Sequence, residues 1–557
     1  MTVDIDGRGF ARLLWRLADL VRVTETRRSF RSKAYRSAVW AIDDLPGLDV
    51  SDEQLLGTPG IGPGVTALIH EYRSTGGINQ LIPLEEAFPR EAHRLRRLPR
   101  MTPKMLRALK SLGIENGADL MGAIESGAAA TVRGAGEQTL ELWRKILQLP
   151  PRPNAIPSHE GWVEAMQLAV HIAEHTTADV QVAGAVRRVE EWVDWIDLVG
   201  IADESDSVTA FLARTAALNE HTRVSDGLYK ATTHSGVVGE IHIAPPTAAG
   251  SALLVATGPP DHVIGLSGAS THGSEEEIYR AAGLGWIPPA ARALPIDEAG
   301  GVVMVEGLRG DLHLHSEDSP DGRMTLETIL QKATTRGYDY VLITDHSEGL
   351  RFGGMSGEAL QAQSMSIERL RIEYPGITIF HGAELNIMED GNLDLDDEAL
   401  QPLDFAVAGV HSYFGQDRDT QTRRVIAAIK HPVVRVLAHP FGRRIGIRPS
   451  IDLDMELIIN AAVEQGVALE TNGHRDRLDL PSEWIEIATE RGALFAANSN
   501  AHRQSEMDNI ANAVATLQRA GVTPDRVVNT WSVEDLTRWI SGNGEAGNRD
   551  SGGEGGI

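Results

Sequence analysis

The order of apolar and polar positions divides the chain into three kinds of sequence. Residues 1–150 carry short helical patterns joined by tight turns. Residues 159–260 combine the helical pattern "GWVEAMQLAVHIAEH" with the strand patterns "VQVAGAV", "IDLVGIA" and "GEIHIA", which predict a small α+β domain. From 306 to 540, apolar runs alternate with amphipathic helical segments, a pattern typical of a β/α barrel or a doubly wound sheet.

Breaks between these regions are rich in proline or glycine. The segment "LPPRPNAIPS" (149–158) has four prolines in ten residues, and "LGWIPPAARALP" marks a second break. We therefore expect a multidomain α+β and α/β protein. Its predicted segments are 1–85 and 86–150 (helical), 159–295 (α+β), 306–540 (strands alternating with helices) and 541–557 (a disordered, glycine-rich tail).

Composition indicates a globular protein of 557 residues with 42% hydrophobic residues. No apolar run approaches the roughly 18 residues of a membrane span. The absence of cysteine excludes disulfides, thiolate zinc sites and cysteine nucleophiles. The start "MTVDIDGRGFARLL" lacks the plan of a signal peptide, so we expect a cytoplasmic, nucleoid-associated protein without a membrane partner.

Charge is unevenly distributed along the chain. Residues 1–157 contain 22 Lys and Arg against 18 Asp and Glu, whereas the remainder contains 30 against 60, and the net charge is −26. Residues 1–157 (the front) are therefore mildly basic, and residues 158–557 (the body) are strongly acidic. An acidic body repels a polyanion unless metal ions or basic loops offset its charge.

Two glycine-rich turns in the front have the same spacing. "LLGTPGIGPGVTALIHEY" holds Gly60, Gly62 and Gly64 between two helical patterns, and "RGAGEQTLELW" repeats the spacing with Gly134 and Gly136. Such a turn lets backbone amides at a helix N-terminus approach a phosphate. The first stretch resembles the helix-hairpin-helix motif of DNA binders that lack sequence specificity. A turn between packed helices remains the alternative.

A third candidate turn and a basic cluster accompany these glycines. "LPRMTPKMLRAL" has similar flanks, but Arg100 and Thr102 stand at the turn, so its amides are less accessible. In "TRRSFRSKAYRSAV", Arg31 and Lys33 lie near two aromatic residues, in a cluster that also holds Arg27, Arg28, Arg36, Phe30 and Tyr35. Beside a phosphate-binding turn this cluster is a plausible DNA contact, although such clusters are usually solvated surface.

Histidines recur at one predicted strand end after another in the back half. His313 and His315 alternate on "DLHLH" and so face one side of a strand. Later strands end in Asp345 with His346 ("YVLITDHS"), Glu384 ("ITIFHGAELNI"), His411 ("FAVAGVHS"), His439 ("VRVLAHPFGR") and His502 ("LFAANSNAH"), and "GVALETN" completes seven strands. Carboxyl ends of barrel strands converge, so these side chains predict a site for several divalent ions.

Residues 309–540 resemble the PHP (polymerase and histidinol phosphatase) domain, a distorted (β/α)7 barrel with a three-metal phosphoesterase centre. Carried over by position, the resemblance implies nine ligands: His313, His315, Asp321, His346, Glu384, His411, His439, Asn500 and His502. "HSEDSPDG" is one residue longer than the family pattern, so Asp318 competes with Asp321. The family has aspartate at position 500, and an uncharged amide there should weaken one metal site.

The chemistry implied is metal-dependent hydrolysis of phosphoesters. Glu384 would bridge metals, and Arg443 of "HPFGR" could hold a phosphate oxygen. Up to three divalent ions are expected, with Mn²⁺ or Zn²⁺ favoured and Mg²⁺ an alternative. In PHP domains attached to DNA-binding modules, the resemblance implies 3′-to-5′ exonuclease activity.

The order of the three regions resembles the bacterial family X DNA polymerases over almost the whole chain. Their nucleotidyltransferase palm carries Gly-Ser-x-Arg-Arg, then two aspartates on a strand and a third on a neighbouring strand. Here "GAVRR" keeps Gly184, Arg187 and Arg188 but has alanine in place of serine. The three metal aspartates correspond to Trp195, Asp197 and Glu240.

These departures predict a palm that no longer polymerises. Trp195 cannot coordinate a metal, and Asp194 should point away from Asp197 on an alternating strand unless a bulge intervenes. The aromatic pair of the family's nucleotide-sugar motif is Val255 and Ala256, and the thumb is short. The family's lyase lysine corresponds to Leu68.

Four functions stay open on the sequence. The leading one is a metal-dependent phosphoesterase acting on DNA (single-strand ends, gapped or nicked duplex), with a vestigial palm and a role in DNA repair implied by the resemblance. The alternatives are an active polymerase and exonuclease using Asp194, Asp197 and Glu240, a non-catalytic DNA-binding scaffold, and a phosphatase for a small phosphate ester.

Overall fold

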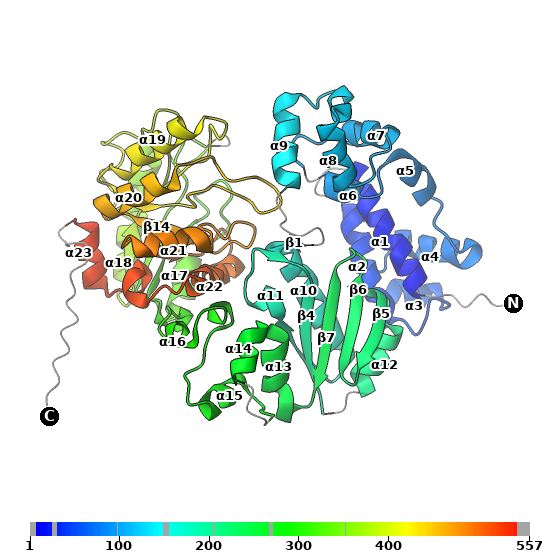
Figure 1. The fold of residues 1–557 in the computed structure, drawn as a ribbon. Helices are drawn as coiled ribbons and strands as arrows, with labels where there is room; N and C mark the ends of the chain where they lie inside the picture. Colours follow the sequence, from blue (N-terminus) through cyan, green and yellow to red (C-terminus); the bar gives the residue numbers. More distant parts are fainter. Residues whose placement is uncertain are drawn as a thin grey trace. The chain divides into compact units, whose positions relative to one another are not determined.

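A computed structural model describes residues 7–24, 30–96, 98–148, 155–203, 206–266, 271–350 and 353–542 (Figure 1). The chain divides into two compact units, Met1–Leu284 with Ile445–Pro449, and Gly285–Arg444 with Ser450–Ile557. Arg27 and Arg28 lie outside the described residues, as does the predicted tail apart from its first two positions. Within the described ranges, no helix is long and apolar enough to cross a membrane.

The first unit begins with helices around an apolar core that includes Phe10, Leu14, Leu106 and Trp143. Their apolar positions recur at helical spacing, which buries one face of each helix. The helices are α1 (Gly7–Thr24), α2 (Phe30–Ala41), α3 (Asp52–Gly57), α4 (Pro63–Thr75), α5 (Leu81–Ala87), α6 (Ala92–Leu95), α7 (Pro103–Ser111), α8 (Gly117–Glu125) and α9 (Glu137–Leu147).

A five-stranded sheet completes the first unit, in the order β2-β4-β7-β6-β5. Its strands are β2 (Asp179–Ala183), β4 (Ile196–Ile201), β5 (Leu218–Ser225), β6 (Leu228–Thr233) and β7 (Val238–Ala244). On one side of β4, Ile196 and Leu198 pack with α10 (Ser158–His175). On the other side, Val199 packs with Leu253 of α13 (Ala249–Thr257), which lies against β4 and β7 (Figure 1).

The buried carboxylate of Asp43 connects the helical part of this unit with the sheet part. It accepts hydrogen bonds from His171 Nε2 on α10 (2.7 Å), from the backbone N–H of Ala216 (2.6 Å) and from the hydroxyl of Thr215. Burial raises the pKa of Asp43, but the hydrogen bonds from His171, Ala216 and Thr215 outweigh it and leave the pKa below its ordinary value. The charged carboxylate of Asp43 therefore links, through buried hydrogen bonds, segments that are more than 100 residues apart in the sequence.

The second unit is a barrel of parallel strands. They are β8 (Gly310–Leu314), β9 (Tyr340–Ile343), β10 (Thr378–His381), β11 (Glu384–Asn386), β12 (Ala406–Gly409), β13 (Val434–Leu437), β14 (Ala468–Asn472) and β15 (Phe495–Asn498). They form two parallel sheets, β10-β9-β8 and β11-β12-β13-β14-β15. Single parallel bridges link the two sheets: Leu314 at the end of β8 pairs with Ala501 after β15, and His346 after β9 pairs with Glu384 of β11.

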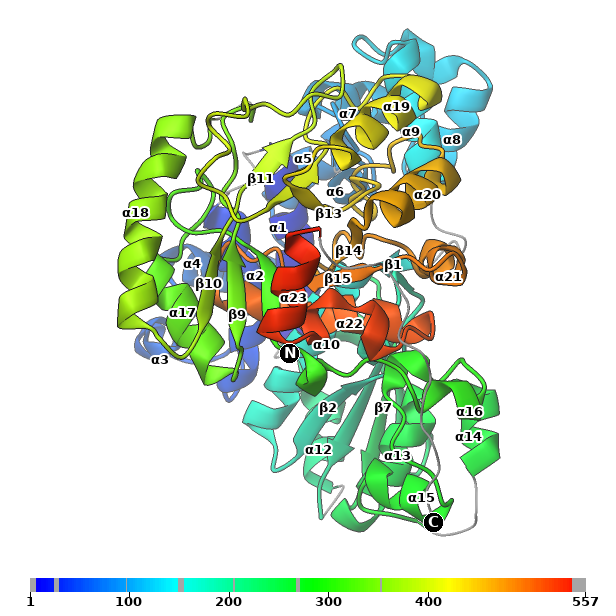
Figure 2. The same ribbon diagram turned by 90° about the vertical axis from the view of Figure 1, so that its left-hand side faces the viewer.

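Helices cover the outside of the barrel, and apolar side chains fill its inside. The helices include α17 (Leu326–Thr335), α18 (Gly357–Glu373), α19 (Arg418–Ile429), α20 (Met455–Gln465), α21 (Ser482–Glu490) and α22 (Ile510–Arg519). Of these, α17 and α18 lie against β9 and β10 (Figure 2). An apolar cluster with members from most strands includes Leu312, Leu342 and Val436, and it packs on Leu536 and Trp539 of α23 (Val533–Ile540). This core leaves the carboxyl ends of the strands for polar side chains.

Replacing Asp43 by alanine should destabilise the first unit by about 3 kcal/mol, because three buried donors lose their acceptor. Since the folded-state pKa lies below the ordinary value of 3.8, the contribution of Asp43 is present above that pH and is lost as the pH falls through the lowered pKa. Urea unfolding at pH 7 and at pH 3 measures both effects. Asp44→Ala is the control, since the half-exposed Asp44 bonds only to His175 among the contacts described and should cost less than about 1 kcal/mol.

Candidate metal centre

Glu384, at the start of β11, lies at the centre of a ring of histidines. Its Oε2 is 3.2 Å from His313 Nε2, 3.4 Å from His315 Nε2 and 3.0 Å from His346 Nδ1. Its Oε1 is 3.0 Å from His411 Nε2 and 2.8 Å from His439 Nε2. Apart from His313, which lies within β8, these histidines follow strand ends, so the barrel topology brings together residues spread over more than 120 positions.

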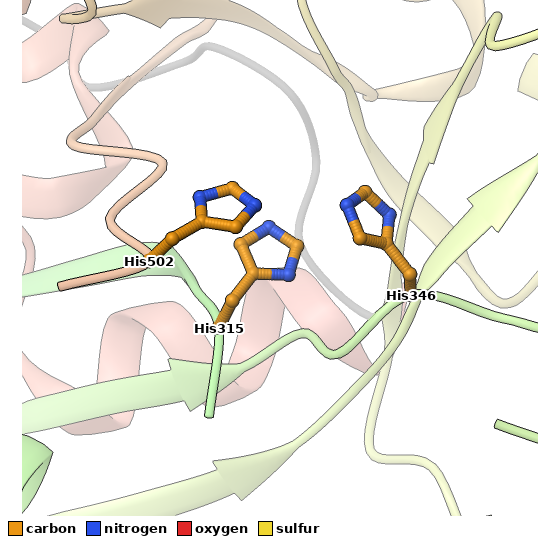
Figure 3. Close-up of side chains that lie close together, drawn as sticks. All are labelled: His315, His346 and His502. Atoms are coloured by element: carbon orange, nitrogen blue, oxygen red, sulfur yellow. The ribbon is translucent and has the colours of Figure 1, made fainter. Parts of the chain in front are cut away.

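A second group of candidate ligands adjoins this ring. His315, His346 and His502 each direct a ring nitrogen into one space, and their ligand atoms lie within 4.8 Å of one another (Figure 3). Asp321 is 3.4 Å from His502 Nε2 and 3.8 Å from His346 Nε2. Asp318 instead accepts a hydrogen bond from Gln363 (2.9 Å). Of the two competing aspartates, Asp321 is therefore the one that faces the histidines.

Asn500 also lies in the cluster, with its Oδ1 3.1 Å from His315 Nε2. All nine positions carried over from the PHP pattern are thus connected by contacts of this kind. Two of them have unusual backbone conformations: His439 has φ 27° and Asn500 has φ 51°. Non-glycine residues rarely adopt positive φ, and such strain is often found at functional sites.

Glu470 on β14 is a buried carboxylate that the sequence analysis missed. Its Oε1 accepts a 2.6 Å hydrogen bond from His313 Nδ1, and its Oε2 accepts one from the backbone N–H of His439 (2.7 Å). A carboxylate that holds one imidazole nitrogen fixes the tautomer and leaves the other nitrogen for a metal. The signal was present, because Glu470 stands near the end of a predicted strand in "GVALETN".

Several buried atoms of the ring have only ion-pair contacts and no well-aligned hydrogen bond among the described residues. They include His313 Nε2, His346 Nδ1, His411 Nε2 and Glu384 Oε2. Polar atoms left unsatisfied in a protein interior are costly, and imidazole nitrogens with carboxylate oxygens are borderline to hard ligands. The donor set therefore fits divalent ions. Gly409 keeps the space open, since a Cβ there would lie 2.9 Å from His439 Cε1 and 3.1 Å from His411 Cε1.

Charges in the ring are strongly coupled. Burial lowers the pKa of His313, but the carboxylates of Glu470 and Glu384 raise it to about 10. Burial raises the pKa of Glu384, yet His313, His411 and His346 hold it well below its usual range. Burial and the nearby Arg477 lower the pKa of His439 to about 3. Glu384 is thus anionic and His439 neutral at pH 7, the forms in which both bind metals.

Arg443, the predicted phosphate ligand, makes hydrogen bonds to the backbone after β14. Its Nε donates to the backbone carbonyl of Arg477 (2.9 Å), and its Nη2 donates to that of Leu478. These bonds hold the chain after β14, and a contact of Arg443 with phosphate stays a prediction. The positive charge of Arg477 does affect the histidine ring, because it lowers the pKa of both His411 and His439. Its Nη1 is buried and makes no hydrogen bond to the residues that the structure describes.

In the sheet of the first unit, Asp197 and Glu240 are paired in register on β4 and β7. Burial and the charge of Glu240 raise the pKa of Asp197 to about 7. The carboxylate of Asp197 lies directly over Gly184, where a Cβ would be 1.8 Å from Oδ2. Only glycine at position 184 therefore accommodates this aspartate.

The stretch before Asp197 is not one continuous strand. β3 (Trp192–Val193) pairs with β1 (Ile156–Pro157), and Asp194 and Trp195 form a bend before β4 begins at Ile196. Asp194 and Asp197 therefore do not lie on one continuous strand, which is the kind of interruption that the prediction of alternating faces allowed for. Trp195 is 45% exposed, and Lys230 Nζ lies 6.0 Å from its ring centroid.

Both arginines after Gly184 bind neighbouring residues. Arg187 forms a two-pronged ion pair with Glu275 (3.0 and 2.7 Å). Arg188 donates to Glu190 Oε1 (2.8 Å) and to the carbonyl of Thr257. Their charges are thus partly neutralised within the fold.

The two glycine turns of the helical part share one geometry. Gly60 and Gly134 have φ of 93° and 98°, and Gly62 and Gly136 are the N-cap residues of α4 and α9 without a side-chain cap. The first backbone amides of both helices therefore have no capping side chain as acceptor. Gly64 lies in the first turn of α4.

The other predicted contacts in this part differ from one another. At the third turn, Thr102 caps the N–H of Met105, which supports the expectation that its amides are less accessible. Arg31 and Lys33 are exposed on α2 beside Phe30, which is 86% exposed. Leu68 is part of the core.

Comparison with known proteins agrees with this geometry. Residues 311–443 match the PHP domain family. The chain is 28% identical over 576 residues to the DNA polymerase/3′-5′ exonuclease PolX of Bacillus subtilis, an alignment that covers 94% of this chain and 99% of that protein. Probable phosphatases of two Thermoanaerobacter strains are 30% identical over 230 residues, which is 40% of this chain and 89% of each relative.

Glu470→Gln should weaken Mn²⁺ binding about 10- to 100-fold, because His313 loses the charged partner that orients it. Isothermal titration calorimetry of the full chain measures the affinity. Glu464→Gln, an exposed position on α20, is the matched control and should bind as the unaltered protein does. Equal affinities for the two variants would contradict the role given to Glu470.

Proposed function

Because the chain belongs to the bacterial family X DNA polymerases that carry a C-terminal PHP domain, we propose that it is a metal-dependent phosphoesterase that trims DNA 3′ ends and whose polymerase site is inactive. The observation that carries the proposal is the Glu384 ring at the carboxyl ends of the barrel strands, with its unsatisfied buried donors. The full-length relative is itself called a polymerase and 3′-5′ exonuclease. A role in DNA repair at the nucleoid fits such an activity.

The nine positions around Glu384 hold the ions, and an imidazole-rich set favours Mn²⁺ or Zn²⁺ over Mg²⁺. Bound divalent ions supply a water of lowered pKa and stabilise the charge that develops on phosphorus. Glu384 contributes the central negative charge. Glu470 holds His313 Nδ1, so that Nε2 faces the ring.

Arg477 binds the phosphate in this proposal. A guanidinium beside a group of cations is unfavourable unless an anion lies between them. Its buried Nη1 has no hydrogen-bond acceptor, and its charge reaches His411 and His439. A phosphodiester oxygen would accept a hydrogen bond from Nη1 and would also place negative charge between the guanidinium and the metal ions. Arg443 is a positioning residue, since it holds the backbone of residues 477 and 478.

The helical part of the first unit binds DNA in this proposal. Uncapped amides after Gly62 and Gly136 contact phosphates without reading sequence, and Arg31 and Lys33 add charge. Such binding suits single-strand ends and gapped or nicked duplex.

Three observations support an inactive polymerase site. Trp195 occupies the position of a metal ligand, and it lies in a bend that leaves its ring exposed. Asp197 has a raised pKa near 7, so it carries only part of a charge at neutral pH. Arg187 is paired with Glu275. Two magnesium ions need more carboxylate charge than Asp197 and Glu240 provide.

A primer-template assay tests the proposal. With Mn²⁺ and a 5′-labelled primer, the full chain should shorten the primer one nucleotide at a time, and His313→Ala should reduce the rate at least 100-fold. Addition of dNTPs should give no extension. The control Asp197→Asn should shorten primers at the normal rate, because Asp197 lies outside the barrel.

The other outcomes identify the alternatives. Extension that depends on dNTPs and is lost in Asp197→Asn would show a working polymerase. Duplex binding without any product would indicate a scaffold. Faster cleavage of a small phosphomonoester than of DNA would indicate a phosphatase.

Arg477→Ala should raise KM for DNA ends and lower kcat, together about 100-fold in kcat/KM, with unchanged metal content. Steady-state kinetics and metal analysis of the same preparation measure this. Arg477→Lys should recover only part of the loss, because lysine lacks the planar fork. Arg369→Ala, exposed on α18, is the control. A loss of metal in Arg477→Ala would show a structural role instead.

A further inference from the structure

A group of candidate ligands beside the main ring has no counterpart in the nine family positions except His502. His474, His502 and Glu506 each offer one ligand atom, and these atoms lie within 4.8 Å of one another. His474 Nε2 is 4.0 Å from Glu506 Oε2. The three side chains are 19–28% exposed, so the group is reachable from solvent without being a fully solvated surface.

Asn500 makes the main ring deficient by one negative charge. Its Oδ1 is 3.1 Å from His315 Nε2, so the amide oxygen takes part in a hydrogen bond with an imidazole that was expected to be a ligand. A neutral amide also binds a divalent ion more weakly than a carboxylate does. The cluster around His502 therefore has the charge of Asp321, 3.4 Å from His502 Nε2, but none from position 500 to balance a divalent ion.

We propose that His474, His502 and Glu506 form a divalent-cation site in which Glu506 supplies the charge that Asn500 lacks. Glu506 is held in place because its Oε2 accepts a hydrogen bond from the backbone N–H of His502 (2.9 Å). Two ligand atoms about 2.1 Å from one ion lie roughly 3–4 Å apart, which matches the spacing of His474 and Glu506.

The neighbours of both imidazoles point to Nε2 as the ligand atom. His502 Nδ1 is 3.0 Å from the carbonyl oxygen of Asn500, which can only accept, so this nitrogen carries the proton. His474 Nδ1 lies 3.8 Å from Asp476 Oδ1, while its Nε2 faces Glu506.

His502 links the site to the main ring. Its Nε2 is also 3.4 Å from Asp321 Oδ2. The ion therefore takes the place of the third ion of the ring, displaced toward residues 474 and 506. The site rests on the metal centre of the proposed function, and its test measures metal rather than hydrolysis.

The test counts Mn²⁺ bound to the full chain by mass spectrometry after equilibrium dialysis, and locates the ions by anomalous diffraction from crystals. The unaltered protein should bind three ions, and Glu506→Gln should bind two, with the peak between residues 474 and 506 lost. Glutamine keeps an oxygen for the His502 amide, so the fold is preserved. Glu534→Gln, an exposed position on α23, should keep three ions.

Asn500→Asp provides the rescue. Combined with Glu506→Gln, it should restore the third ion, now at position 500. Three ions with unchanged affinity in Glu506→Gln, or two ions in both it and the unaltered protein, would overturn the site. A protein that binds no ion at all would overturn the proposed function with it, which is a separate result.

Discussion

The single negative charge of Glu384, surrounded by five imidazoles, is the interaction on which the second unit depends. A carboxylate taken out of water is unfavourable unless cations or hydrogen bonds compensate it. Here the compensation comes from histidines of four other strand ends, which the β/α order brings to one side of the barrel. Glu470 adds a second buried carboxylate, which accepts a hydrogen bond from His313 Nδ1. Fold and site are thus determined by the same contacts.

Sequence indicated which residues would meet in this barrel, because parallel strands end on the same side and the histidines stand at their ends. It could not choose between Asp318 and Asp321, since the choice depends on the path of the loop: Gln363 of α18 takes the first and the histidines take the second. Nor could it predict that Arg443 donates hydrogen bonds to the carbonyls of Arg477 and Leu478, which lie 34 and 35 positions later.

In the first unit, the family resemblance implied that Asp197 and Glu240 lie on neighbouring strands, as they do, whereas the bend at Trp195 could not be predicted. The bend follows from a two-residue pairing of β3 with Ile156 and Pro157, a contact between segments that local patterns do not connect. Asp43 is a similar case. Its hydrogen-bond partners lie 128 to 173 positions away in the sequence. The local sequence "AIDDLPG" contains no pattern that predicts burial of this aspartate. Polar contacts between residues so far apart in the sequence cannot be predicted from the spacing of apolar and polar positions.

The two bridges that close the barrel have a consequence for how each unit tolerates change. One bridge joins His346 to Glu384, and the other joins Leu314 to Ala501, next to His315, Asn500 and His502. Both backbone bridges therefore involve candidate metal ligands or residues next to them. Strand β4 of the first unit, by contrast, is paired along its whole length with β2 and β7, and its fold does not need a second carboxylate. The fold of the first unit therefore does not depend on the carboxylates of a nucleotidyl-transfer site, whereas substitutions at His346, Glu384, Leu314 or Ala501 alter residues whose backbones join the two sheets of the barrel.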